Sequence, residues 1–123
     1  MTTTVAVAGA SGRLGKVVCQ VIEEHPDFEL VARLGSASAP EEGAEAELLI
    51  DVTNPDASPV IVERALRRGQ KVIVGTSGWP AAKIEMLRGW VEELDAVAFL
   101  IPSFSYASAV AGSLVLKAAP YFD

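Results

Sequence analysis

The sequence has one cysteine, one histidine and fewer basic than acidic residues. A single cysteine, Cys19, can form neither an internal disulfide nor a thiolate cluster, which is typical of a reducing, cytoplasmic compartment. The net charge of −6 lacks the surplus of Lys and Arg that nucleic-acid backbones recruit, so we expect no nucleic-acid partner. The opening residues, MTTTVAV, lack the basic start of a signal peptide.

The titratable residues show no pattern of a metal or catalytic centre. His25 stands before Pro26 at the expected end of a helix, where a cap or a surface imidazole is the expected role. The glutamates of residues 41–47 fall in one loop without a histidine and are expected to solvate it. We therefore expect neither catalytic residues nor metal ligands in these 123 residues.

One uncharged stretch, residues 96–116, is long enough to span a bilayer. Pro102 and several serines interrupt it, so it divides better into a buried strand, a turn and a helix of small residues over 106–119. We expect no membrane association.

What remains is a half-apolar chain in which short apolar runs alternate with amphipathic ones. The predicted strands cover residues 4–8, 28–34, 48–52, 71–74 and 97–101. The predicted helices cover about 14–25, 56–68, 80–94 and 106–119, and residues 35–47 read as an acidic surface loop. This alternation predicts one α/β domain over residues 1–123, a doubly wound, Rossmann-type parallel sheet of about five strands with helices on both faces. We expect the strand order 3-2-1-4-5.

Three glycines, Gly9, Gly12 and Gly15, follow the first strand in "VAVAGASGRLGKVV". Glycines here permit a tight turn, close approach of a pyrophosphate and packing of the helix, and the helix N-terminus attracts anions. The spacing G-x-x-G-x-x-G is not the commoner G-x-G-x-x-G, so a purely structural βα turn stays open beside dinucleotide binding. Arg13 can reach phosphate oxygens or be a solvated arginine. Val17 excludes a P-loop, which needs Ser or Thr there.

The second predicted strand ends without the acid that holds a ribose 2′-hydroxyl in NAD-preferring folds. The expected position is Gly35, with Arg33 before it and Ser36 after it. A cation and no carboxylate predict that NADPH is tolerated or favoured beside NADH, although Arg33 can also be a solvated strand residue.

Irregular stretches follow four of the predicted strands: "GASGRLG", "TNP", "GTSG" and "PSFS". In a parallel sheet these carboxyl ends meet at one edge, where ligands bind. Together the four motifs resemble 4-hydroxy-tetrahydrodipicolinate reductase, an enzyme family of bacterial lysine and diaminopimelate biosynthesis, over nearly the whole chain. The family has similar "GA-x-GRMG", "DFT-x-P", "GTTG" and "PNFS" motifs.

The resemblance implies the sites of an NADPH or NADH cofactor. Gly9, Arg13 and Leu14 would meet the pyrophosphate and adenosine side, with Gly12 and Gly15 in the same loop. Thr53 would lie near the phosphates or ribose. The nicotinamide ribose would be met by Gly75, Thr76 and Ser77, and the carboxamide by Pro102, Ser103 and Phe104. Val52 and Ser103 depart from the family's aromatic and asparagine, which affects the nicotinamide side most.

The resemblance also implies a substrate half, with a histidine region and a "K-x-DAPSGT"-like stretch, that is absent from this sequence. A hydride donor and acceptor must come within about 3–3.5 Å. We therefore expect a fragment, a truncated chain or one piece of a split enzyme, inactive alone, whose full-length form binds a small cyclic dicarboxylate and is a homo-oligomer. A stand-alone regulatory or redox-sensing module and the nucleotide domain of another reductase remain alternatives.

Four further side chains have structural expectations. Asp51 is expected to satisfy loop amides rather than to act as an acid or base. Cys19 is expected to be an inert, partly buried thiol. Trp90, on the predicted helix over residues 80–94, is expected to pack in the core. Trp79 is expected to anchor the loop before that helix.

Overall fold

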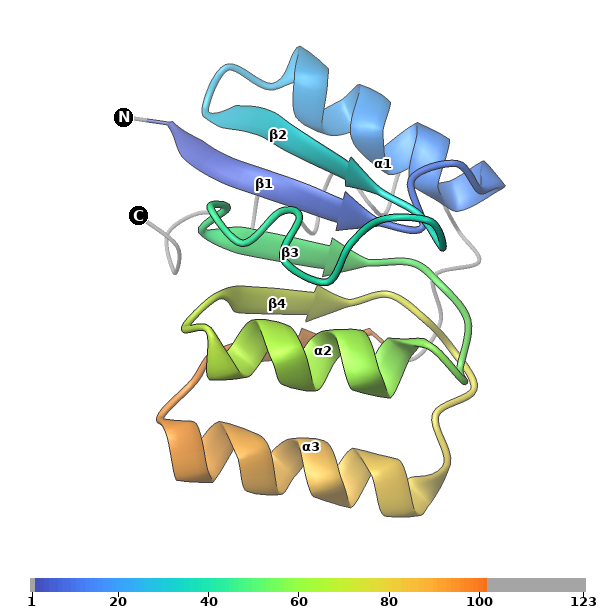
Figure 1. The fold of residues 1–123 in the computed structure, drawn as a ribbon, viewed down its shortest axis with the longest axis vertical. Helices are drawn as coiled ribbons and strands as arrows, with labels where there is room; N and C mark the ends of the chain where they lie inside the picture. Colours follow the sequence, from blue (N-terminus) through green and yellow to red (C-terminus); the bar gives the residue numbers. More distant parts are fainter. Residues whose placement is uncertain (1, 102–123) are drawn as a thin grey trace.

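The computed structural model describes residues 2–101, which form one parallel sheet flanked by helices (Figure 1). In chain order the elements are β1 (Thr3–Ala8), α1 (Arg13–Glu24), β2 (Phe28–Leu34), β3 (Leu48–Asp51), α2 (Ser58–Arg67), β4 (Lys71–Val74), α3 (Ala81–Leu94) and β5 (Ala98–Leu100). The predicted Rossmann-type fold class is confirmed, and each element within the described range lies within about two residues of its predicted bounds. The helix predicted over 106–119 lies outside the described residues.

The strand order is β2-β1-β3-β4-β5, so the predicted order 3-2-1-4-5 is wrong. β3 pairs with β1, from Val5 opposite Leu48 to Ala8 opposite Asp51, instead of extending the sheet beyond β2. All four residues of β3 are buried, whereas β2 carries the exposed Glu29 and Arg33. Burial favours the middle of the sheet for β3, whose one carboxylate, on Asp51, has hydrogen-bond partners, and the edge for β2 with its exposed charges. The switch point therefore lies between β1 and β3.

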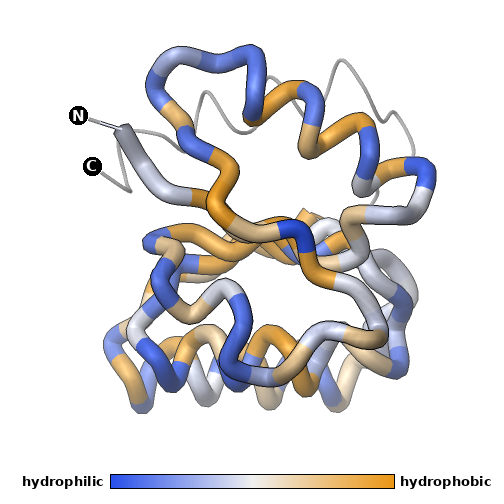
Figure 2. Tube along the Cα trace, turned by 45° about the horizontal axis from the view of Figure 1, so that its top comes forward, coloured by the Kyte–Doolittle hydropathy of each residue, from blue (hydrophilic) through white to orange (hydrophobic). Residues whose placement is uncertain are grey.

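Each face of the sheet is covered by its own helices. Val5, Val7 and Ile50 pack with α1 on one face, while Ala6 and Leu49 pack with α2 and α3 on the other, here called the α2 face. Side chains of neighbouring strand residues point to opposite faces, so the apolar strands supply both cores. Figure 2 shows this arrangement, with hydrophobic colour concentrated in the strands and alternating along the helices.

The parallel strands bring their carboxyl ends to one edge of the sheet. In Figure 1 the arrowheads point the same way, and the connections β1–α1, β3–α2 and β4–α3 gather beyond them. Three of the sequence motifs, "GASGRLG", "TNP" and "GTSG", therefore lie at the carboxyl-terminal edge of the sheet, as predicted. The fourth, "PSFS", begins where the described residues end. Within residues 2–101, no helix is long and apolar enough to cross a membrane.

Candidate functional site

The glycine loop between β1 and α1 is packed so tightly that a side chain at either of two glycines would clash with backbone atoms. Gly9 has φ +84°, and a Cβ there would lie 2.3 Å from the carbonyl oxygen of Val52. A Cβ on Gly15 would lie 1.9 Å from the carbonyl oxygen of Gly9, because α1 packs directly on the loop. Gly9 therefore makes the tight turn, and Gly15 permits the close packing of the helix, as the sequence predicts.

Gly12 differs from the other two glycines because the protein's own packing does not require it. Its φ of −74° suits any residue, and a Cβ there would meet only the oxygen of Gly9, at an ordinary 3.5 Å. It precedes the first residue of α1, and no side chain caps the amides of that helix end. The backbone is thus bare where a helix N-terminus meets the groove described below, which fits the close approach of an anionic pyrophosphate.

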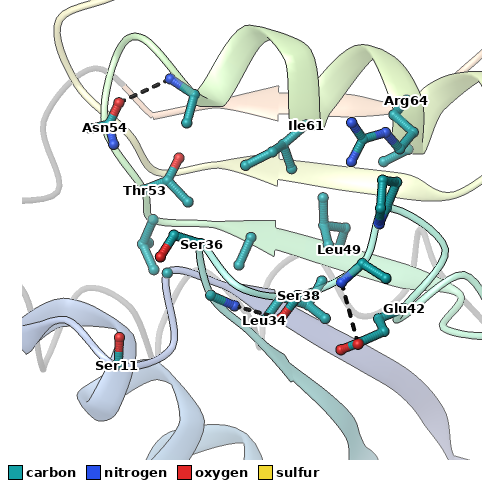
Figure 3. Close-up of a pocket in the computed structure, with 18 of the residues that line it drawn as sticks. Ser11, Leu34, Ser36, Ser38, Glu42, Leu49, Thr53, Asn54, Ile61 and Arg64 are labelled. Atoms are coloured by element: carbon teal, nitrogen blue, oxygen red, sulfur yellow. Dashed lines mark hydrogen bonds between the residues drawn. The ribbon is translucent and has the colours of Figure 1, made fainter.

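A groove of about 380 Å³ runs from the glycine loop along the α2 face (Figure 3), within the usual range of small-molecule sites. One wall is the chain after β2, and the other is the β3–α2 connection and α2 itself. The lining residues are Ala8, Gly9, Ser11, Gly12, Leu34, Gly35, Ser36, Ser38, Ala39, Pro40, Glu42, Leu49, Val52, Thr53, Asn54, Ala57, Ile61, Arg64, Ala65, Arg68 and Gln70. Its floor is apolar and its rim carries hydroxyls, amides, two arginines and the carboxylate of Glu42.

The structure brings four of the sequence-predicted site residues to this groove: Gly9, Gly12, Ser36 and Thr53. The other described ones do not line it: these are Arg13, Leu14, Gly15, Arg33, Gly75, Thr76 and Ser77. Pro102, Ser103 and Phe104 lie outside the described residues.

Arg33 lies on the opposite face of the sheet from the groove. Its guanidinium forms an ion pair with Glu23 of α1, which raises the pKa of the arginine. Arg33 instead borders a separate hollow beside α1, whose lining includes Lys16, Cys19 and Glu23. Because side chains alternate along a strand, Leu34 faces the groove and Arg33 does not. Burial raises the pKa of the Cys19 thiol, as expected of an inert cysteine.

The ends of β3 and β4 are joined by a cluster of hydroxyls around Asp51, which is fully buried. Thr53 Oγ1 donates to Asp51 Oδ1 at 2.6 Å, and Thr76 Oγ1 donates to Asp51 Oδ2 at 2.8 Å. Ser58 Oγ, at the start of α2, also donates to Oδ2, and accepts from Trp79 Nε1 at 2.9 Å. The carboxylate therefore ties the β3–α2 and β4–α3 connections together.

This cluster corrects one expectation and confirms another. The side chain of Asp51 accepts from hydroxyls rather than from loop amides, whereas its backbone oxygen accepts the Gly75 N–H at 2.8 Å. Trp79 is 8% exposed and anchors its loop through Ser58, as expected. The side chain of Thr76 is buried, with its hydroxyl occupied on both sides by Asp51 and by the Thr53 N–H.

Asn54, in the "TNP" motif, holds the turn that leads into α2. Its side-chain oxygen accepts from the N–H groups of Asp56 and Ala57 at 3.0 and 2.9 Å, and its carbonyl accepts from Ser58. Figure 3 shows Asn54 in this role at the end of the groove, next to Thr53.

Sequence reasoning missed the part of the groove formed by residues 38–42. The small, acidic composition indicated only a solvated loop, yet this loop crosses β1 on the α2 face. Gln70 donates to the carbonyls of Gly43 and Ala46 at 2.8 and 2.9 Å and so fixes it there. Apolar residues at helical spacing in α2, such as Ile61, gave no sign that they border a ligand site.

The remaining titratable residues form no second centre in the described part of the chain. His25 is the C-cap residue of α1, and its Nδ1 accepts from the Asp27 N–H at 3.1 Å. Residues 2–101 contain no group of three or more potential metal ligands.

Comparisons with known proteins extend over this whole region. The model of a family described as dihydrodipicolinate reductase, N-terminus, matches residues 3–104. The 4-hydroxy-tetrahydrodipicolinate reductase of Clavibacter michiganensis subsp. michiganensis is 42% identical over 124 residues, covering 100% of this chain and 45% of that protein. That of Streptomyces coelicolor is 34% identical, covering 97% and 49%. The chain therefore spans about half the length of these curated relatives.

Solved structures agree in fold. Dipicolinate-bound dihydrodipicolinate reductase from Paenisporosarcina sp. TG-14 has a TM-score of 0.74 at 15% identity, covering 98% of this chain and 55% of that one. Homoserine dehydrogenase from S. aureus has a TM-score of 0.69 at 16% identity, covering 81% and 32%. At these identities the likeness shows a shared fold and no more.

Proposed function

The chain belongs to the dihydrodipicolinate reductase family, whose N-terminal part it matches, and we propose on this premise that it binds the nicotinamide dinucleotide of a 4-hydroxy-tetrahydrodipicolinate reductase. The observation that carries the proposal is Gly12. It is a glycine that the protein's own packing leaves replaceable, at a helix N-terminus that opens on a groove. The family match favours this role over a stand-alone regulatory module.

The groove suggests how the dinucleotide lies. The glycine loop and the start of α1 would hold the pyrophosphate on backbone amides. The apolar strip that includes Leu34, Pro40 and Ile61 would take the adenine, and Ser36 would lie near its ribose. Gly75 and Ser77 follow β4 beside this site, and with residues 102–104 are proposed to border the nicotinamide.

We propose that both NADH and NADPH are accepted. β2 ends at Leu34 and is followed by Gly35 and Ser36, so no carboxylate at that point repels a 2′-phosphate. Arg33 is on the other face and is not needed for this argument. Arg64 and Arg68, both on the groove wall, bring two positive charges to it, against the one carboxylate of Glu42.

The reaction itself is proposed for the whole protein. The dinucleotide supplies a hydride when bound, which reduces one double bond of a small cyclic dicarboxylate. This chain's residues bind and orient the cofactor. The parts that bind the dicarboxylate, deliver the proton and assemble a homo-oligomer are proposed to come from outside these 123 residues. We expect a cytoplasmic enzyme.

Titration of the chain with NADPH and NADH, followed by cofactor fluorescence, tests the proposal. We expect both to bind, and absence of binding at millimolar concentrations of either would overturn it. The matched variants Ser36→Asp and Ala37→Asp place the same charge at neighbouring positions of one loop, but only residue 36 lines the groove. Ser36→Asp should weaken NADPH at least tenfold while sparing NADH, and Ala37→Asp should change neither.

A further inference from the structure

The hydroxyl cluster around Asp51 has a defined direction of proton donation. A carboxylate can only accept, so Ser58, whose oxygen already accepts from Trp79 Nε1, donates its hydroxyl proton to Asp51. Thr76, whose oxygen accepts from the Thr53 N–H, likewise donates its hydroxyl proton to Asp51. Both protons arrive at Oδ2.

Thr53 is the member of the cluster that also lines the groove. Its hydroxyl proton is directed to Asp51 Oδ1, with the two oxygens 2.6 Å apart. In Figure 3 the hydroxyl oxygen of Thr53 points to the side of Asn54, at the end of the groove by the β3–α2 connection. A hydroxyl whose only proton is already donated in a hydrogen bond can accept a hydrogen bond from a ligand but cannot donate one.

We propose that Asp51 is a positioning residue that makes Thr53 a hydrogen-bond acceptor, so that Thr53 recognises a hydroxyl or amino group of the dinucleotide and not its phosphates. Phosphate oxygens are acceptors at neutral pH and gain nothing from a second acceptor. The ribose hydroxyls and the amino groups of the two bases are the donors available. The identity of this ligand rests on the proposed function, whereas the direction of the Thr53 proton does not.

The variant Asp51→Asn is expected to reverse the polarity of Thr53. Ser58 and Thr76 must still donate, so the amide oxygen of the substituted side chain has to take the place of Oδ2. The amide nitrogen then faces Thr53 Oγ1 and donates to it. The Thr53 proton is released toward the groove, where it opposes a donor on the ligand.

Binding of two probes to single and double variants tests the proposal. Thr53→Val should weaken NADH about three- to tenfold, the effect of one hydrogen bond, and leave inorganic pyrophosphate unchanged. Asp51→Asn should also weaken NADH, but should add nothing in the Thr53→Val background. Thr4→Val, which removes a hydroxyl that accepts from Glu47 at the far end of the sheet, is the matched control and should change neither affinity.

Two results of these titrations would overturn the proposal. One is an equal loss of pyrophosphate affinity in Thr53→Val, which would make Thr53 a phosphate donor. The other is a loss of NADH affinity in the double variant Asp51→Asn/Thr53→Val equal to the product of the two single-variant losses. That result would mean that Asp51 does not act through Thr53.

A measurement on the unmodified chain keeps the proposal testable if Asp51→Asn does not fold. Hydroxyl-proton exchange by NMR should find the Thr53 proton protected in the wild type, and exchange at the rate of an exposed threonine would overturn the proposal. If the wild type bound neither NADH nor NADPH, the proposed function would fail while this exchange rate still decided the proton's direction. If the wild type bound both cofactors but Asp51→Asn weakened NADH further in the Thr53→Val background, the role of Asp51 would be refuted while the proposed function stood.

Discussion

At the glycine loop, residues 9–15 bring backbone against backbone, whereas at the junction of β3 and β4 side-chain hydroxyls converge on one carboxylate. Both regions lie at the same edge of the sheet and border the same groove. In the loop, a Cβ on Gly15 would meet the carbonyl of Gly9, and the amides of the helix start carry no side-chain cap. At the junction, Asp51 takes protons from Thr53, Ser58 and Thr76.

The difference shows how one edge of the sheet can be held rigidly and still offer hydrogen-bond donors to a ligand. The junction satisfies its polar groups internally, which stabilises the connections but leaves few donors for a ligand. In the loop, the N–H groups of Gly9, Ala10 and Gly12 donate to backbone carbonyls and α1 packs closely on the loop, whereas the first amides of α1 carry no side-chain cap. Substitutions in the two regions should therefore affect folding and binding in different proportions.

The largest effect on stability is expected for Gly15→Ala. Its Cβ would stand 1.9 Å from a backbone oxygen, so the loop and α1 must move apart, at a cost of about 3 kcal/mol or more. Gly89→Ala in α3, where nothing lies within 4 Å, should instead stabilise the chain by about 0.5–1 kcal/mol. Urea denaturation of both variants measures this, and similar stabilities would show that the loop is not tightly packed.

Asp51→Ala comes next. It leaves the hydroxyls of Ser58 and Thr76 buried without their acceptor, and we expect a loss of about 2–4 kcal/mol in the free energy of unfolding. Asp56→Ala, at an exposed position five residues along, should stay within about 0.5 kcal/mol of the wild type. A loss below about 1 kcal/mol for Asp51→Ala would contradict the view that the junction is held by its carboxylate.

A smaller loss is expected for Trp79→Phe, which removes the indole N–H that donates to Ser58. The predicted cost is about 1–2 kcal/mol from the hydrogen bond, beyond the cost of the lost ring volume. Trp90→Phe removes the same volume at an equally buried site whose indole has no hydrogen-bond acceptor among the described residues. Thermal denaturation should show Trp79→Phe to be the less stable variant. Equal midpoints would mean that the hydrogen bond from the Trp79 indole to Ser58 does not stabilise the fold.

The periodicity of apolar residues predicted the elements well, because strand and helix spacing are local properties. Strand order is not local, and the expected order was wrong. A signal was present in β2, where Glu29 and Arg33 mark an edge strand, while Leu48 to Ile50 carry no charge. The observed order is the other common order of doubly wound sheets, and here residues 35–47 connect β2 to β3 by a loop without a helix.

Structural roles were predictable where backbone conformation or close packing demands glycine, as at Gly9 and Gly15, although Gly15 does not line the groove. They were less so where a side chain's direction decides its role. Arg33 and Leu34 are neighbours in sequence, yet only Leu34 faces the groove. The part that Asp51 plays depends on Ser58, Thr76 and Trp79, which come together only through the pairing of β3 with β4. No spacing within the sequence reveals such a cluster.

The most direct test of the account is Gly12→Ala, measured for both stability and dinucleotide affinity. The structure has room for this Cβ, so the free energy of unfolding should stay within about 1 kcal/mol of the wild type. The methyl group would occupy the place where a pyrophosphate approaches the backbone, so affinity for NADH and NADPH should fall at least tenfold. A stable variant that binds both cofactors as tightly as the wild type would contradict the assignment of the glycine loop as the pyrophosphate site.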